Sequence, residues 1–234
     1  MSNTKLFIKA CKYKIRDMVD NKSVPINWHK SFILYPFKLL LHPIDTFNDL
    51  KYEGKSSYII SFIMAILFFA VKLLEQTVTS YLFMPEGGEN VSIWTVLAIS
   101  IGLLVVFSAC NWATSTLVDG EGTFGDIWIA VTYSLLPSIL FSSLNIVLSY
   151  FFTETEATFY SFFATLGTLW SILLVFLGLM VVHQYTVTKT VFSVLATLVI
   201  ILCLVFLLLL FMSIYQQIYS FVINIFREII IRQL

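Results

Sequence analysis

Three carboxylates lie close together in one polar segment and raise the question of a cation site. Asp119, Glu121 and Asp126 fall within eight residues. The segment begins like a calcium-binding EF-hand loop, but Phe124 stands where that loop needs a glycine and Ala130 where it needs a bidentate glutamate. The sequence therefore predicts no metal ligands in this segment.

Thr123 and Asp126 have a spacing that predicts a helix N-terminus instead. A threonine followed three residues later by an acid forms a capping box, in which each side chain accepts a hydrogen bond from the other residue's backbone amide. The negative charge of Asp126 also favours the positive end of the helix dipole. Capping is thus favoured over metal binding for this pair.

His183 lies in a second polar segment and could act as a base beside Asp119. No metalloprotease helix, nucleophile elbow, paired-carboxylate motif or phosphate-binding glycine loop accompanies it in the sequence. A lone loop histidine is more often an interfacial residue, and Trp112 and Tyr185 are typical of the aromatic belt. We therefore predict no catalytic residue, no metal and no cofactor, and we expect that the protein is not an enzyme.

Polar side chains inside the apolar segments are a second group of candidates. Lys72 and Glu75 are three residues apart and so share a helical face. Charges at membrane depth are functional candidates, but this pair lies toward one end of its segment, where an anchor at the headgroups is favoured over an ion relay. Asn111 and Asn145 are expected to hydrogen-bond between helices.

Pro137 lies about ten residues, roughly 15 Å, into an apolar segment and so near the middle of the bilayer. Proline has no backbone N–H, so the carbonyl of Tyr133 loses its usual partner and the helix bends. The bend could serve as a hinge or as a notch facing a substrate. Packing alone is favoured, because proline is frequent in spanning helices.

The composition places all these residues in an integral membrane protein. Of 234 residues 59% are hydrophobic and only 12% charged, with a mean hydropathy of +0.89, whereas soluble domains have about 25% charged residues. This excludes a soluble enzyme and a disordered chain, and a net charge of zero gives no support to nucleic-acid binding. We predict an all-α, polytopic helical bundle whose transmembrane domain covers residues 57–223, with five spans at about 57–81, 93–117, 127–152, 159–182 and 191–212.

The remaining segments are assigned by charge and helical pattern. Ten of the 14 Lys and Arg precede residue 57, so the positive-inside rule places the N-terminus in the cytoplasm. Residues 1–41 are expected to form a cytoplasmic tail with a membrane-surface segment. Residues 42–56 are expected to form an interfacial helix with Pro43 in its first turn, Asp45 early and Gly54 at its end. Residues 213–234 have the pattern of an amphipathic helix, which could extend the fifth span or lie among the headgroups.

Several short motifs occur in a fixed order along the predicted helices. They are His42 to Phe47, which includes Pro43 and Asp45; Asn111 with Trp112; Asp119 with Gly120; Gly122 with Thr123; Tyr133 with Pro137; and His183 with Tyr185. In these residues the chain resembles the Yip1 family of five-span membrane proteins, and specifically its bacterial branch, over about residues 40–234. The resemblance implies a cytoplasmic N-terminal region and five helices, and it does not imply an enzyme.

The resemblance also implies a class of function. Eukaryotic Yip1 relatives bind small GTPases and one another, whereas bacterial relatives often look like accessory proteins of solute transporters. We therefore expect a scaffold or accessory protein in a bacterial cytoplasmic membrane. Its partners would be the lipid bilayer and other membrane proteins, either a transporter complex or a second copy, and its docking face would comprise the tail, the helix at Pro43 and the Asp119 segment. The alternative is a transporter or channel component with a path lined by Asn111, Asn145, Lys72, Glu75 and the bend at Pro137.

Overall fold

The computed structural model describes residues 35–52, 57–80, 83 and 92–233, and within these ranges the regular structure is helical. Five helical segments there are long and apolar enough to cross a membrane. They are Tyr58–Thr77 (α4), Ile93–Leu117 (α5, η4 and α6), Phe124–Leu148 (α7 and α8), Glu154–His183 (η5 and α9) and Val187–Ile225, which belongs to α10. The predicted all-α membrane bundle is confirmed.

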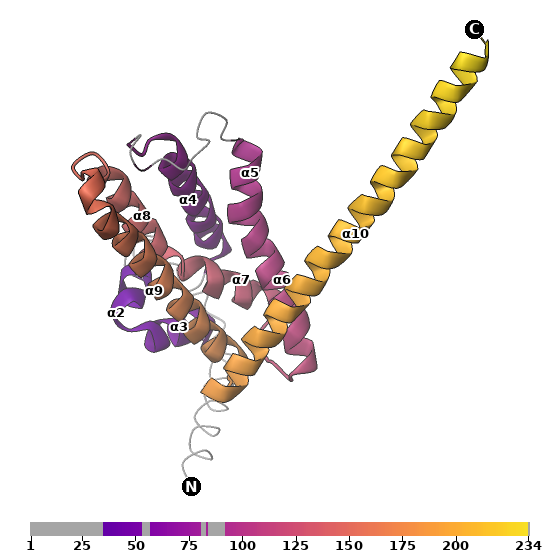
Figure 1. Cartoon of the computed structure of the whole chain (residues 1–234). Coiled ribbons are helices and arrows are strands. Elements are labelled where there is room, and N and C mark those ends of the chain that lie inside the picture. The colour runs from indigo at the N-terminus through magenta and orange to yellow at the C-terminus, as the bar shows by residue number, and fades with distance from the viewer. Residues whose placement is uncertain (1–34, 53–56, 81–82, 84–91, 234) are drawn as a thin grey trace.

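The helices form one bundle, and we name its two ends (Figure 1). Helices α6 (Leu103–Leu117) and α9 (Ala157–His183) end where α7 (Phe124–Tyr133) and α10 (Val187–Gln233) begin, and we call this the His183 end. Helix α8 (Leu136–Leu148) finishes at the opposite end, where the Tyr150 hydroxyl donates to the Val78 carbonyl just after α4. We call this the Tyr150 end.

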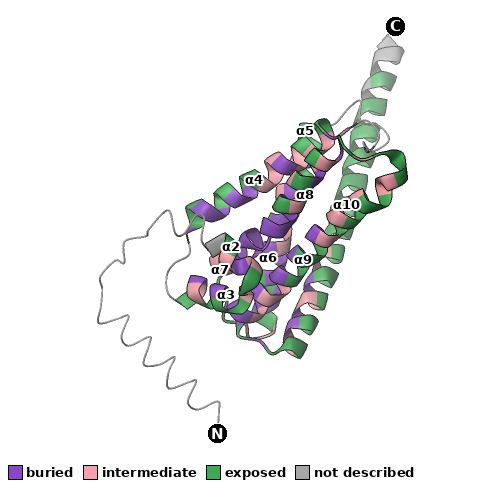
Figure 2. Ribbon diagram, turned by 90° about the vertical axis from the view of Figure 1, so that its left-hand side faces the viewer, coloured by how far each residue is buried: buried purple, intermediate pink, exposed green. Residues whose placement is uncertain are grey.

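Helix α7 forms the centre of the bundle. Every residue from Ile127 to Tyr133 is buried, and the helix contacts α4, α6 and α9. Figure 2 shows this region as the purple core, whereas most of α10 is green and exposed. A helix that is apolar all round its circumference suits such a position, because neighbours cover each of its faces.

The predicted bend is a full interruption of the helix. α7 ends at Tyr133 and α8 begins at Leu136, with Pro137 in its first turn. There the missing N–H of proline would have no helical partner in any case. The next residue, Ser138, donates its backbone N–H to the Ser171 hydroxyl of α9 over 3.0 Å. A neighbouring helix thus supplies a hydrogen-bond partner that the first turn of α8 lacks.

Two short helices precede the first span. Helix α2 (Tyr35–Leu41) is joined to α3 (Pro43–Tyr52) by an ion pair between Lys38 and Asp49 of 2.8 Å. Pro43 opens α3 and Asp45 lies exposed in its first turn, as the pattern predicts. The helix packs on α9 through its buried face. The predicted tail up to residue 34 and the expected helix end at Gly54 lie outside the described residues.

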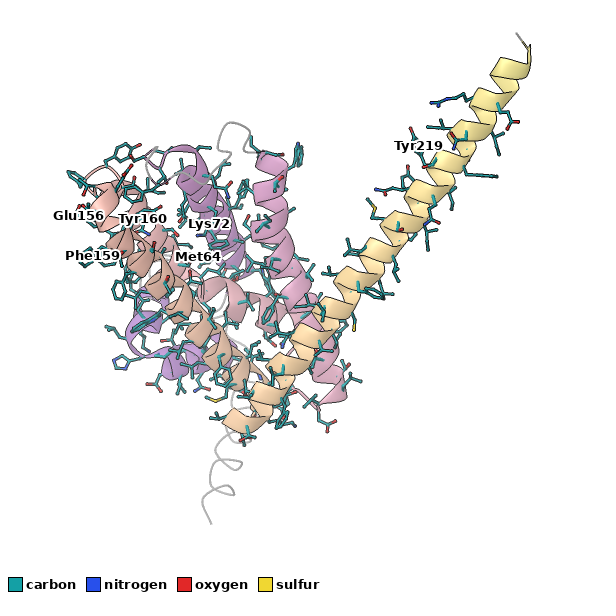
Figure 3. All side chains as sticks on the ribbon, in the orientation of Figure 1. Met64, Lys72, Glu156, Phe159, Tyr160 and Tyr219 are labelled. Atoms are coloured by element: carbon teal, nitrogen blue, oxygen red, sulfur yellow. The ribbon has the colours of Figure 1, made fainter. Side chains whose placement is uncertain are left out.

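The fifth span and the C-terminal amphipathic segment form one continuous helix. α10 runs from Val187 to Gln233, 47 residues or about 70 Å, because no glycine or proline interrupts this stretch. It contacts α6 and α9 near its start and then leaves the bundle (Figure 1). Figure 3 shows Tyr219 on the part that projects beyond the other helices.

Candidate functional site

A chain of buried hydrogen bonds joins three helices at the His183 end. The Asn111 side-chain oxygen on α6 lies 3.1 Å from Nε2 of His183, and the Gly122 backbone N–H donates to Nδ1 of His183 over 3.4 Å. Because Nδ1 accepts a hydrogen bond, the proton lies on Nε2 and the ring is neutral. Asn111 and His183 have relative exposures of 0% and 1%, so water does not compete for these bonds.

The Asn111 amide nitrogen extends this chain to the fifth span. It donates to the Thr197 hydroxyl of α10 over 3.1 Å, and Thr197 lies 3.2 Å from the Thr114 hydroxyl. Thr114 and Thr197 are fully buried. We call Asn111, Thr114, His183 and Thr197 the polar brace, because they hold α6, α9 and α10 together by side-chain hydrogen bonds.

The Tyr185 ring packs against the polar brace. The ring stacks on His183 at 5.0 Å between centroids, and Lys189 lies 4.7 Å above the Tyr185 ring. Burial and the nearby negative charge of Asp119 raise the pKa of the Tyr185 hydroxyl, which stays protonated and donates to the Val118 carbonyl over 3.3 Å. Tyr185, which the sequence indicates as an aromatic-belt residue, is covered by the protein itself.

His183, which the sequence indicates as an interfacial residue, is likewise enclosed by the protein. The segment after α6 folds over the histidine and is held close by two glycines. A Cβ atom on Gly120 would lie 2.5 Å from the Tyr185 hydroxyl, and one on Gly122 would lie 2.5 Å from Val182 Cγ1. Side chains at these two positions would push the segment away, so the close approach requires glycine.

Asp119 closes the end of α6 in a left-handed conformation. Its φ is 53°, and the following Gly120 N–H donates to the Ser115 carbonyl over 2.8 Å. This pattern is the Schellman motif, whose left-handed position is usually glycine. Asp119, whose carboxylate was a candidate metal ligand or partner of a base, thus has a structural role at the end of α6.

We expect Asp119→Gly to stabilise the protein by about 0.5 to 1 kcal/mol, because glycine takes a left-handed backbone without the steric cost of a side chain. Thermal unfolding of the detergent-solubilised protein would show a raised melting temperature. Asp45→Gly, in the first turn of α3 and at ordinary helical φ, is the control and should lower it. A lower melting temperature for Asp119→Gly would contradict the proposed backbone role.

The predicted capping box is confirmed at the start of α7. The Asp126 N–H donates to the Thr123 hydroxyl over 3.3 Å, and the Thr123 N–H donates to the Asp126 carboxylate over 3.1 Å. Within the described ranges no group of three His, Cys, Asp or Glu side chains is placed to hold a metal ion. The acidic segment therefore begins a helix.

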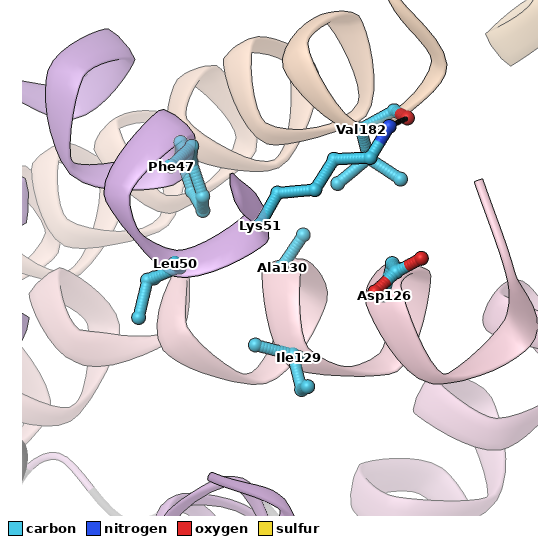
Figure 4. Close-up of a pocket in the computed structure, with 7 residues that line it drawn as sticks. All are labelled: Phe47, Leu50, Lys51, Asp126, Ile129, Ala130 and Val182. Carbon is cyan, nitrogen blue, oxygen red and sulfur yellow. Dashed lines mark hydrogen bonds between the residues drawn. The ribbon is translucent and has the colours of Figure 1, made fainter. Parts of the chain in front are cut away.

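Lys51 connects the short helix α3 to this end of the bundle (Figure 4). Its ammonium donates to the Val182 carbonyl in the last turn of α9, where a cation also favours the negative end of the helix dipole. With Asp126 and four apolar residues, Lys51 and Val182 line a cavity of about 10 Å³. That is room for roughly one water molecule. The contact of Lys51 is not predictable from the sequence, because 131 residues separate the lysine from its acceptor.

A second polar cluster lies toward the Tyr150 end. The Lys72 ammonium binds the Glu75 carboxylate at 2.7 Å and the Ser142 hydroxyl of α8 at 3.1 Å. One turn further along α8, the Asn145 amide donates to the Tyr160 carbonyl over 3.1 Å. We call these residues the Lys72 cluster.

The structure divides the expected polar path into separate parts. Asn111 belongs to the polar brace, while Asn145 lies with Lys72 and Glu75 toward the opposite end of the bundle. Pro137 lies between them in a buried turn. Of the other candidates, Trp112 is 47% exposed and Tyr133 is fully buried.

Comparison with known protein families gives a match. A family model described as the Yip1 domain matches residues 37–210, which begin in α2 and end within α10. No curated protein and no solved structure matches the chain. The matched range contains the whole polar brace and the Lys72 cluster.

Proposed function

The chain belongs to the Yip1 domain family, and from this premise we propose that it is a non-enzymatic scaffold or accessory protein that binds other membrane proteins. The resemblance to bacterial members of the family favours a bacterial cytoplasmic membrane. We place the N-terminus in the cytoplasm, because most Lys and Arg precede the first span. A solute transporter complex or a second copy of the chain would be the partner. Its role would be to hold that partner rather than to convert a substrate.

The hydrogen bonds of the polar side chains at the His183 end support this proposal. Both ring nitrogens of His183 have partners inside the protein, and Asn111 uses its oxygen and its nitrogen. A general base needs a nitrogen within reach of a substrate proton. The neutral, enclosed histidine is suited to bracing helices and is poorly placed for catalysis.

An exposed apolar surface next to this brace is the observation that carries the proposal. Helices α2 and α3 lie outside the five spans, yet Phe37, Leu41, Ile44 and Tyr52 are between 41% and 79% exposed. We call these four residues the α2–α3 surface. Exposed apolar patches mark interaction sites with proteins or membranes. Since α3 is fixed on α9, the surface is held in a defined position.

The test is affinity purification of the full chain from its native membrane in mild detergent. We expect a protein partner in stoichiometric amount with the wild type. Its recovery should fall about tenfold in Leu41→Ser/Ile44→Ser, because interfaces depend on a few well-placed apolar side chains. Phe151→Ser, 76% exposed near the Tyr150 end, should leave recovery unchanged. Equal recovery in all three proteins, or purification of the wild type alone, would contradict the proposal.

A transporter or channel component is the alternative function, and one observation favours it. The side-chain oxygen of Asn145, a member of the Lys72 cluster, is buried and has no hydrogen-bond partner among the described residues. A buried polar atom without a partner is costly in a membrane. Loss of a measured flux in liposomes for Asn145→Leu, with the fold intact, would support this alternative over the scaffold.

A further inference from the structure

The part of α10 that has left the bundle carries a line of polar side chains. Ser213, Gln217, Ser220 and Asn224 follow one another at intervals of four, three and four residues. Residues at these intervals share the face by which one helix meets another in a left-handed pair. All four are exposed, and all lie within Val187–Ile225, the part of α10 that is apolar enough to cross a membrane. We call these four residues the α10 stripe.

The α10 stripe faces away from the other helices of its own chain. Steps of seven residues lead back along the same face from Gln217 through Leu210 to Cys203, which is exposed. Val194 lies nine residues before Cys203, about two and a half turns, so the two residues are on opposite sides of the helix. Val194 packs against the hydrophobic core of the bundle. The opposite side, which carries the stripe, is therefore turned outward.

The two amides of the α10 stripe have no partner in their own chain. Among the described residues, the side chains of Gln217 and Asn224 make no hydrogen bond. Figure 1 shows α10 inclined to α5 and α6, and an inclined helix uses more residues to cross the hydrocarbon, which keeps the stripe at membrane depth. Water does not satisfy an amide there, and amides of spanning helices hydrogen-bond to a neighbouring helix instead.

We propose that two copies of the chain associate through the α10 stripe, with their α10 helices parallel. Two copies with the same orientation in the membrane present each residue at the same depth, so an amide of one copy meets the identical amide of the other. An amide has both N–H donors and an acceptor oxygen and so pairs with its own kind. This self-complementarity identifies the second copy as the occupant. The inference rests on the proposed function for the class of partner and uses a surface other than the α2–α3 surface.

Cys203 provides a direct test, because its position on the same face would bring it beside Cys203 of the second copy. In a Cys11→Ser/Cys110→Ser background, copper–phenanthroline added to native membranes should oxidise the two thiols to an intermolecular disulfide, seen as a dimer on a non-reducing gel. In the same background, Cys203→Ser/Val205→Cys moves the thiol to the far side of α10 and should lower the yield about tenfold. Equal yields, or no dimer from Cys203, would overturn the proposal.

The role of the amides is tested by the monomer–dimer equilibrium of the full chain in mild detergent, followed by native mass spectrometry. Gln217→Leu/Asn224→Leu should raise the dissociation constant of the dimer about tenfold, because it removes the hydrogen bonds between the helices. Tyr215→Leu/Tyr219→Leu is the matched control. It removes two polar groups that each lie two residues from Gln217, on the far side of α10, and should dimerise as the wild type does. Equal dissociation constants for both variants would overturn the assigned contact.

This inference and the proposed function can fail separately. Leu41→Ser/Ile44→Ser changes the α2–α3 surface and leaves the α10 stripe intact, so its dimer should be as stable as that of the wild type while the protein partner is lost. A monomeric wild type that still recovers a protein partner would overturn the pairing of α10 alone. A stable wild-type dimer whose partner recovery does not depend on Leu41 and Ile44 would support the α10 stripe and contradict the α2–α3 surface.

Discussion

Phe47→Ala is expected to destabilise the protein by about 3 to 5 kcal/mol, the usual cost of removing a fully buried aromatic ring. Phe47 is 2% exposed, and it fixes α3 on α9 at a point where Gly178 has no side chain. A Cβ atom on Gly178 would lie 2.9 Å from the tip of the Phe47 ring. The ring thus fills the space that the glycine leaves. The loss should appear as a lower melting temperature of the detergent-solubilised protein, with unfolding monitored by tryptophan fluorescence.

The same helix provides the control for this measurement. Ile44 is 46% exposed on α3, so Ile44→Ala should cost less than about 1 kcal/mol, since little of its surface is buried on folding. Comparable losses for Phe47→Ala and Ile44→Ala would show that α3 is not anchored through Phe47. The anchoring of α3 also determines whether Lys51 can reach α9, so the two contacts should be lost together.

Asn111→Leu is expected to destabilise the protein by about 2 to 4 kcal/mol. Leucine has the same branched shape, so the cost comes from lost hydrogen bonds. The His183 Nε2–H is left without an acceptor, and the Thr197 hydroxyl loses the Asn111 donor while it keeps Thr114 and Ser193 as partners. An unsatisfied buried donor costs about 1 to 3 kcal/mol, and the second lost hydrogen bond adds about 1 kcal/mol. The measurement is again the melting temperature of the solubilised full chain.

A double-mutant cycle separates this bond from a general loss of packing. His183→Phe removes the ring nitrogens and keeps an aromatic ring that can stack on Tyr185. If Asn111 and His183 act through their mutual bond, the double variant should be more stable than the sum of the single losses predicts. Strictly additive losses would mean that the two residues stabilise the fold independently, and the polar brace would then lack its central bond.

The local features of this protein could be predicted from the residues alone. Length and hydropathy predict the five spans, because a helix needs about 20 apolar residues to cross the hydrocarbon. Neighbouring residues likewise predict the capping box at Thr123 and Asp126, Pro43 at the start of α3, and a bend at Pro137, where the structure has a full interruption of the helix. Each of these depends on hydrogen bonds within one or two helical turns.

The tertiary structure decided which polar residues meet. Asn111 and His183 are 72 residues apart, and Lys51 and its acceptor carbonyl are 131 apart. Their contacts depend on how each helix is rotated and where its neighbours cross it, which hydropathy leaves open because most faces of a spanning helix are apolar. For the same reason the sequence could not show that Asn111 and Asn145 lie in separate clusters, or that Tyr185 is buried against His183. Helix packing, rather than residue type, assigned His183 to the interior of the fold.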